Sequence, residues 1–263
     1  MKKITAISLA LFMLLGTCIS ASAAAQVAAL MYHEVTTDES RHDDWGVSPE
    51  QLEADINYFL ECGYVSITAS ELADESYENL DGKKILLLTF DDGYVGWYTD
   101  VYPILERTGA KATMFVVGSY INRYGYLSES QIREMANCGM IEIGNHTNHI
   151  HQMPLEPLKA LYNSANVRDV LDDIGSNSEK LSRITGKSVT SISWPYGYST
   201  DWLNEHVRSE LGYTMAFSTQ TGVNYYKGDT EIVFNRVNRE YSLTSEGLYE
   251  FVENNLNKQK LNK

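Results

Sequence analysis

The amino-acid sequence predicts an α/β protein built as a barrel, and three observations lead to that prediction. Short apolar runs alternate along the chain with segments of helical periodicity, which is typical of a largely parallel sheet covered by helices. Polar, reactive side chains follow several of these runs, as they do at the carboxyl face of a barrel. The chain of 263 residues, less a short N-terminal leader, suits one barrel without a second domain.

The leader has the features of a secretory signal peptide. Lys2 and Lys3 precede an apolar run from Ile4 to Leu15, and small residues follow over 21–25. The apolar run is too short to cross a bilayer. We therefore expect a signal peptide over 1–25, one catalytic domain over 26–263, and a secreted or extracytoplasmic protein without stable membrane insertion. Association with the cell surface and the oligomeric state both stay open.

Five apolar runs are expected to form buried strands of the sheet. They cover residues 28–31, 85–88, 112–117, 140–143 and 189–194. Helices are expected between them, because residues 48–51 and 128–131 each have capping-box spacing and an apolar face follows until Gly63 and Gly139, respectively. Further helices are expected over 155–184, as one long or two shorter segments, and over 246–256.

The charge balance limits the possible partners. With 35 acidic and 21 basic residues, the formal net charge of -14 disfavours a nucleic acid or an anionic membrane as a partner. A neutral or amine-bearing substrate fits better. Cys62 and Cys138 each precede a glycine at an expected helix end, and we expect two small buried thiols, with one disulfide as the alternative.

Two adjacent carboxylates follow the second apolar run. Asp91 and Asp92 stand in the segment Thr89-Phe90-Asp91-Asp92-Gly93, where the chain has just left the core. Carboxylates in such a place cost desolvation free energy unless a cation or hydrogen-bond donors bind them. A plain Asp-Gly turn is the alternative interpretation.

Three of the six histidines fall within six positions after the fourth apolar run, at His146, His149 and His151. Imidazoles and one carboxylate form a common ligand set for a catalytic divalent metal, with open positions for water and substrate. Spacing alone does not choose between His146 with His151 and His146 with His149. A solvated histidine-rich loop is the alternative interpretation.

In chain order, the segment 89–93, the histidine cluster 146–151 and Pro195-Tyr196-Gly197 resemble the motifs of the polysaccharide deacetylases of carbohydrate esterase family four. The resemblance covers nearly all of the chain after the leader. Segments 31–35, 63–64 and 111–116 further resemble a secreted subgroup that includes poly-N-acetylglucosamine deacetylases.

The resemblance implies a distorted barrel of about seven strands, with Asp91 as general base and Asp92 as metal ligand. The commonest family spacing would place the second histidine ligand four positions after His146, where this chain has a residue that cannot ligate. The subgroup spacing of five residues points to His151 as the second imidazole ligand, with His149 in reserve.

Two departures from the family pattern require replacement residues. Ser193 stands where the family has an arginine that tethers the general base, and Arg236 is the candidate for that cation, with a surface position as the alternative. No histidine follows His206, so the general acid that the family keeps near its C-terminus is missing. His33, after the first apolar run, is the candidate to protonate the leaving amine, and a structural histidine is the alternative.

Aromatic residues beside the motifs are candidates for stacking on a sugar ring. Tyr94, Trp194, Pro195 and Tyr196 form the expected substrate-binding set, with Trp97 close to Tyr94 in sequence. Packing within the barrel is the alternative role for these aromatic side chains.

The expected function is metal-dependent removal of N-acetyl groups from an amino-sugar polysaccharide or oligosaccharide, such as poly-N-acetylglucosamine or a cell-wall glycan. The metal held by Asp92, His146 and His151 would activate a water, Asp91 would accept its proton, and His33 would protonate the amine. Zinc is the expected ion, with cobalt or nickel as alternatives. The competing functions are an O-acetyl esterase acting on xylan or another acetylated glycan and a degenerate carbohydrate-binding barrel.

Overall fold

The computed structural model describes residues 23–74, 80–163, 167–228 and 233–261. Residues 1–22, which make up most of the predicted signal peptide, lie outside this part of the chain. The first strand begins at Ala25, and the boundary after residue 25 stays a prediction. Within the described ranges, none of the helices is both long and apolar enough to cross a bilayer.

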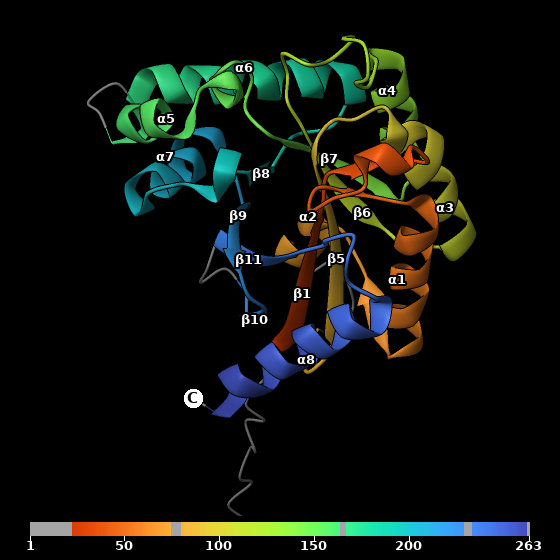
Figure 1. The fold of residues 1–263 in the computed structure, drawn as a ribbon. Coiled ribbons are helices and arrows are strands. Elements are labelled where there is room, and N and C mark those ends of the chain that lie inside the picture. Colours follow the sequence, from red (N-terminus) through yellow and green to blue (C-terminus); the bar gives the residue numbers. More distant parts are fainter. Residues whose placement is uncertain (1–22, 75–79, 164–166, 229–232, 262–263) are drawn as a thin grey trace, which may run out of the picture.

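Seven parallel strands close into a barrel, and helices surround it (Figure 1). In order around the ring they are β1 (Ala25–Tyr32), β5 (Lys84–Asp92), β6 (Ala112–Val116), β7 (Ile141–Asn145), β8 (Ser191–Ser193), β9 (Met215–Thr221) and β11 (Val233–Asn238). The ring closes where β1 pairs with β5 on one edge and with β11 on the other. The predicted seven-stranded barrel is confirmed, and its distortion includes the register shift between β9 and β11.

Short strands extend this ring at two edges. β4 (Tyr64–Ser66) pairs in parallel with the start of β5, and β10 (Asn224–Tyr226) pairs antiparallel with the start of β1. A separate two-stranded sheet joins β2 (Glu34–Val35) to β3 (Gly46–Val47) just beyond the carboxyl end of β1. This small sheet ties the segment between β2 and β3 to the mouth of the barrel.

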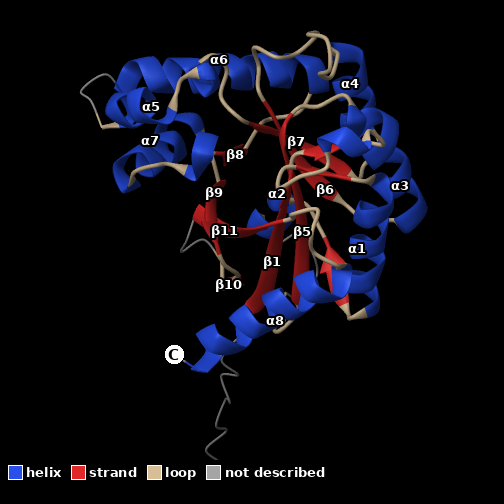
Figure 2. Ribbon diagram, viewed as in Figure 1, coloured by secondary structure: helices blue, strands red, loops and turns tan. Residues whose placement is uncertain are grey.

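The helices begin where the sequence predicts capping boxes. α1 (Pro49–Glu61) and α4 (Glu129–Asn137) start at Ser48 and Ser128, and both capping boxes form. The segment 155–184 holds two helices, α5 (Leu155–Tyr162) and α6 (Val167–Thr185). The remaining helices are α2 (Ala69–Ala73), α3 (Tyr102–Thr108), α7 (Asp201–Leu211) and α8 (Ser245–Leu261), and a π-helical turn spans Trp97–Val101. Figure 2 shows α1, α3, α4 and α6 outside the strands, whereas α2 contributes Ala69 and Leu72 to the same core cluster as Val27 of β1.

The strands are apolar on both faces because each face meets a different core. Val27, Ala29 and Leu87 belong to a cluster inside the barrel, whereas Leu30 and Leu88 belong to the cluster between the barrel and its helices. Burial on both sides explains the continuous apolar runs that predicted these strands. Cys62 and Cys138 are free, so the alternative of a disulfide between them is not realised.

α8 packs across the amino end of the barrel, far from the carboxyl ends of the strands (Figure 1). Glu253 of α8 pairs with Lys84 at the start of β5 and accepts a hydrogen bond from Tyr64 at the start of β4. β1 also begins at this end. The opposite end of the barrel is thereby left to the loops that follow β1, β5, β7 and β8.

Candidate active site

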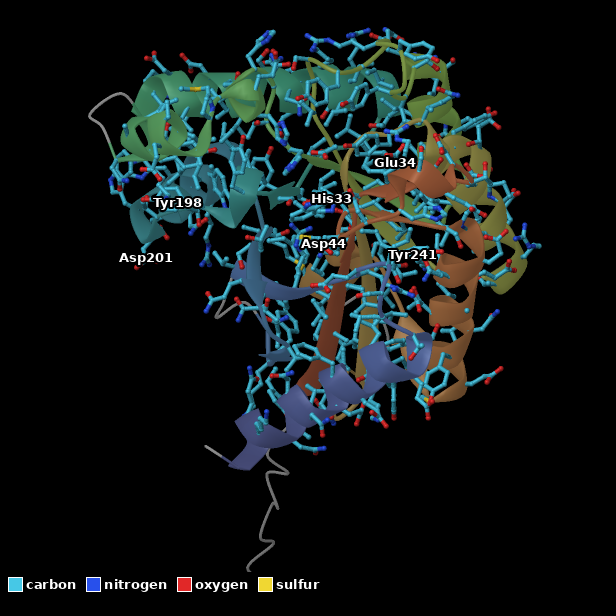
Figure 3. The ribbon with its side chains drawn as sticks, in the orientation of Figure 1. His33, Glu34, Asp44, Tyr198, Asp201 and Tyr241 are labelled. Carbon is cyan, nitrogen blue, oxygen red and sulfur yellow. The ribbon has the colours of Figure 1, made fainter. Side chains whose placement is uncertain are left out.

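The carboxyl ends of the strands surround a cavity of about 590 Å³. β1 leads into His33, β5 ends at Asp91 and Asp92, and β7 leads into His146. Its lining includes all of these residues together with His151. Figure 3 shows His33 and Glu34 at the end of β1, with Asp44 and Tyr241 beside them. A cavity of this size is typical of a small-molecule site.

Asp92, His146 and His151 form a group that could hold a metal ion. One ligand atom from each lies within 4.8 Å of the others. Asp92 Oδ1 lies 3.1 Å from His151 Nε2 and 3.5 Å from His146 Nε2. The side chain of His149 is exposed and is not part of this group, so its place as the reserve ligand is wrong.

The hydrogen bonding of His146 is compatible with a metal ion bound by Asp92, His146 and His151. His146 Nδ1 lies 2.7 Å from the carbonyl oxygen of Ser193, an acceptor, so this nitrogen carries the proton. Nε2 is therefore the ring nitrogen that faces Asp92, and it is the atom of His146 that could bind a metal ion. Burial opposes ionisation of Asp92, but hydrogen bonds from His146 and His151 hold the pKa of Asp92 well below its usual range. The donor set therefore fits a divalent metal.

Three residues at this site have a strained backbone conformation. Asp92, Thr147 and Tyr196 all have positive φ, at 88°, 62° and 56°. Residues other than glycine rarely adopt this conformation, and it persists only where the surrounding structure enforces it. Its presence at three places around one cavity indicates a functional site.

Asp91 is buried and held by an ion pair with Arg236. The guanidinium nitrogens of Arg236 lie 2.8 Å and 2.7 Å from the two carboxylate oxygens of Asp91, and Ser193 Oγ donates to Asp91 Oδ2 at 2.9 Å. Arg236 is fully buried, which excludes the surface alternative. Burial alone would raise the pKa of Asp91, but Arg236 lowers that pKa to about 2.

His33 lines the same cavity as the carboxylates and follows β1, the strand next to β5, with Tyr32 paired to Phe90. Its Nδ1 is buried without a hydrogen-bond partner among the described residues, and Trp97 Nε1 donates to its backbone carbonyl at 2.7 Å. Burial lowers the pKa of His33, and the nearby Asp91 and Asp92 offset this only in part. His33 is therefore mainly neutral at pH 7, which differs from the protonated state expected for it from the sequence.

The predicted aromatic set is only partly exposed to the cavity. Tyr94 is half-buried and Tyr196 is 52% exposed, and both line the cavity. Trp194 also lines the cavity, but its side chain is fully buried and donates to Asn204, and Trp97 is buried away from the cavity. Pro195 is buried and is not among the residues that line the cavity. Trp97 therefore has the packing role that was the alternative, and substrate binding by Trp194 stays a prediction.

Trp45 is the main cavity residue that sequence reasoning missed. It is 52% exposed, lines the cavity and contacts the His33 ring edge-on, with 4.7 Å between ring centroids. Its position in the chain gives little indication of this role, because it lies in a polar loop rather than beside a motif. The return of that loop to the end of β1, through β2 and β3, is a tertiary feature.

Helix α6 clasps the loop that carries His146. Asn177 Nδ2 lies 2.8 Å from the carbonyl oxygen of Thr147 and 2.9 Å from Asn145 Oδ1. Asp173 accepts from the backbone N–H groups of Asn148 and His149, at 2.7 Å and 2.8 Å. Asp173 and Asn177 are four residues apart and so lie on one face of the helix. This face fixes the loop whose backbone is strained at Thr147.

Replacing Asn177 with alanine should lower the free energy of unfolding by about 2–3 kcal/mol, since buried acceptors lose their donor. The measurement is urea unfolding of the metal-free protein, followed by metal titration, in which affinity should also fall. Asn255→Ala is the matched control, because that amide bonds only to Phe251 within α8. Equal free energies of unfolding for the two variants would show that the hydrogen bonds of Asn177 do not stabilise this loop.

Comparison with known proteins identifies the family. The sequence profile described as "Polysaccharide deacetylase" matches residues 78–216. The chain belongs to the polysaccharide deacetylase family. The YxkH protein of Bacillus subtilis (strain 168) is 30% identical over 201 residues, 75% of this chain and 66% of that protein. A poly-beta-1,6-N-acetyl-D-glucosamine N-deacetylase of Staphylococcus aureus (strain MSSA476) is 23% identical over 163 residues, 60% of this chain and 56% of that protein.

A solved structure has a similar fold. IcaB from Ammonifex degensii aligns with a TM-score of 0.73 and 22% identity, covering 88% of this chain and 97% of that one. This chain spans about two thirds or less of the curated relatives that it matches. The profile match begins after His33 and ends before Arg236. The predicted substitutes for the general acid and for the arginine of the family pattern therefore both lie outside the matched segment.

Proposed function

We propose that this polysaccharide deacetylase removes N-acetyl groups from an amino-sugar polymer with the help of a divalent metal. One observation carries the proposal: a potential metal-ligand group, an arginine-bound aspartate and a buried histidine face the same cavity. The name of the Staphylococcus aureus relative supports poly-N-acetylglucosamine as the substrate class. The acidic net charge is compatible with a polymer that gains amines as it loses acetyl groups.

Asp92, His146 and His151 would hold the metal. When bound there, a divalent ion lowers the pKa of water and polarises an acyl oxygen. Mixed nitrogen and oxygen ligands suit zinc best, with cobalt or nickel as substitutes. The lysine-led apolar leader supports secretion through a signal peptide over residues 1–25, which leaves a catalytic domain over 26–263.

Asp91 and His33 divide the proton transfers in this proposal. Asp91, kept ionised and oriented by Arg236, accepts a proton from the attacking water. Asp91 passes this proton to His33, which is neutral at the outset and delivers it to the amide nitrogen. A carbon–oxygen bond forms, the carbon–nitrogen bond breaks, and the water's proton ends on the amine. Burial keeps bulk water from competing for that proton.

One observation favours an O-acetyl esterase as the second candidate function. The lowered pKa of His33 means that little imidazolium is ready to protonate a leaving group. An ester needs that protonation less than an amide does, because an alkoxide leaves more easily than an amide anion. Xylan or another acetylated glycan would then be the substrate.

Acetate release separates these functions. Mature protein with zinc is assayed on N-acetylglucosamine oligomers of β-1,6 and β-1,4 linkage and on acetylated xylan, with Asp91→Asn as the inactive control. Acetate from a glucosamine oligomer, lost in Asp91→Asn, supports the proposal. Release from xylan alone makes the protein an esterase, and metal binding without any release makes it a binding protein.

The pH profile tests the proton path. Because the pKa of His33 lies below its usual value of 6.5, kcat/KM should fall as pH decreases through that pKa and should be level above pH 6.5. His33→Gln should lose about 10²-fold in rate together with this acid limb. Bound metal is measured at each pH, because His146 and His151 also titrate. A rate that falls as pH rises from 5 to 7 would instead require protonated His33 in the free protein.

A further inference from the structure

The cavity extends beyond the candidate catalytic groups toward one wall formed by residues 38–46, which we call the rim loop. Ser40, Arg41, Asp43, Trp45 and Gly46 of this loop line the cavity. The catalytic groups described above use none of these side chains. The wall is nevertheless part of the same space as Asp92 and His33.

The rim loop is held firmly although its side chains are exposed. Asp43 Oδ1 accepts from the backbone N–H groups of Trp45 and Gly46, at 2.8 Å and 3.0 Å. The carbonyl oxygen of Trp45 accepts from the N–H of Glu34 at 3.0 Å. At Gly46 a Cβ atom would lie 2.1 Å from the carbonyl oxygen of Arg41, so only glycine fits there. These contacts hold the rim loop in one conformation.

The loop is also fastened to the segment after β11. Asn238 Nδ2 donates to the carbonyl oxygen of Asp44 at 2.8 Å. The N–H of Tyr241 donates to the carbonyl oxygen of Asp43 at 3.1 Å. Figure 3 labels Asp44 next to His33 and Tyr241 farther toward α1, and the Tyr241 ring stacks on His42 of the rim loop. Two separate parts of the chain thus support a loop that presents a large apolar ring to solvent at the cavity.

We propose that Trp45 forms a second sugar-binding subsite, in which its indole ring stacks on the pyranose ring next to the sugar that loses its acetyl group. One face of a pyranose ring is apolar, and an aromatic ring that is already ordered binds it at little cost in conformational entropy. Arg41 and Asp43 border the same space and supply a donor and an acceptor for sugar hydroxyls.

This inference rests on the proposed function, because it names the form in which the substrate is recognised: an oligomer rather than a single sugar. The potential metal ligands and Trp45 line the same cavity of about 590 Å³, so a sugar at the ligands and a sugar on Trp45 would occupy one continuous space. The contact between Trp45 and His33 places the subsite directly beside the reacting group.

The test compares wild type, Trp45→Ala, Trp45→Phe and Trp202→Ala. Trp202 is the matched control, because it is 45% exposed and also packs on a histidine, His206, but does not line the cavity. Values of kcat/KM for acetate release are measured with N-acetylglucosamine, its disaccharide and its tetrasaccharide, and with 4-nitrophenyl acetate. The small ester reports the catalytic groups alone.

In wild type, the second sugar ring should raise kcat/KM about tenfold. Trp45→Ala should lose this gain, Trp45→Phe should keep part of it, and Trp202→Ala should keep all of it. Because Trp45 also packs on His33, its variants are compared by the ratio of kcat/KM for the disaccharide to that for the small ester, which should fall about tenfold in Trp45→Ala and stay at the wild-type value in Trp202→Ala. The proposal is overturned if Trp45→Ala retains the gain, or if it loses ester and oligomer hydrolysis in parallel, since the ring would then act only through His33.

A binding measurement keeps this outcome separate from that of the proposed function. Calorimetric titration of the metal-stripped protein with the same mono-, di- and tetrasaccharide needs no turnover. A gain in affinity for the second ring that depends on Trp45, without acetate release, supports the subsite and overturns only the proposed activity. Equal affinities for the disaccharide in wild type and Trp45→Ala overturn the subsite.

Discussion

An Asp92→Asn variant is expected to bind metal poorly and to lose about 10³-fold in kcat/KM for acetate release, equivalent to ~4 kcal/mol of transition-state stabilisation. Asparagine keeps the shape of the side chain and tolerates the positive φ of 88° at this position, so the change removes charge without refolding the turn. The measurement pairs metal content, by elemental analysis, with steady-state kinetics.

Asp201→Asn is the control for this variant, because Asp201 is an exposed residue in the first turn of α7. It should keep wild-type metal content and activity. Added zinc should restore part of the Asp92→Asn activity, since the two imidazoles remain. Full activity of metal-free Asp92→Asn would eliminate the metal from the proposed mechanism.

Replacing Arg236 with methionine is expected to lower the free energy of unfolding at pH 7 by about 3–5 kcal/mol, because it leaves Asp91 as a buried charge without a partner. In wild type, the depressed pKa of Asp91 contributes stability that is present above the usual carboxyl pKa of 3.8 and is lost as pH falls toward 2. Without Arg236, burial raises the pKa of Asp91, so the penalty should shrink as pH falls.

Two further variants show whether this effect belongs to the ion pair. The double variant Arg236→Met with Asp91→Asn should recover much of the lost stability, because no buried charge remains. Arg107→Met, which breaks an exposed pair with Glu53, should change stability little. Equal pH dependence of wild type and Arg236→Met would show that Asp91 does not need its partner.

Arg236 also explains how the chain departs from its family pattern. Ser193 hydrogen-bonds both Asp91 and Arg236, so the serine and the arginine surround the carboxylate from β8 and β11. The double variant Ser193→Arg with Arg236→Ser places the arginine on β8 instead of β11, and this arginine should again pair with Asp91. The site thus depends on where a charge lies in space, and two strands of the ring can supply it.

Much of the fold could be predicted because it follows local rules. The capping boxes at Ser48 and Ser128 and the apolar runs of β1, β5 and β6 are visible in short windows of sequence. β9 and β11 were not predicted, since polar side chains interrupt both strands. Ser218 and Arg236 are buried polar residues, and the partners of the Arg236 guanidinium, which include Asp91, come from other strands of the ring.

The parts of the candidate site that lie in compact motifs could be predicted from the sequence. The parts that depend on tertiary contacts could not. Asp92, His146 and His151 follow two strands that end on the same face, so their meeting was foreseeable. The burial of Trp194 and the exposure of Trp45 are the reverse of what their neighbours in sequence suggest. Solvent exposure of a single ring depends on which helices and loops pack over it.

The placement of the start of β1 and of α8 has a practical consequence when the protein is coupled to a solid support. β1 starts and α8 lies at the amino end of the barrel, opposite the cavity. A bead, carrier protein or coated surface coupled near Ala25 or along α8 would hold the molecule with its cavity directed outward. An affinity tag at either place leaves the approach of a long glycan strand clear, so immobilised and free protein should present the same face to their substrate.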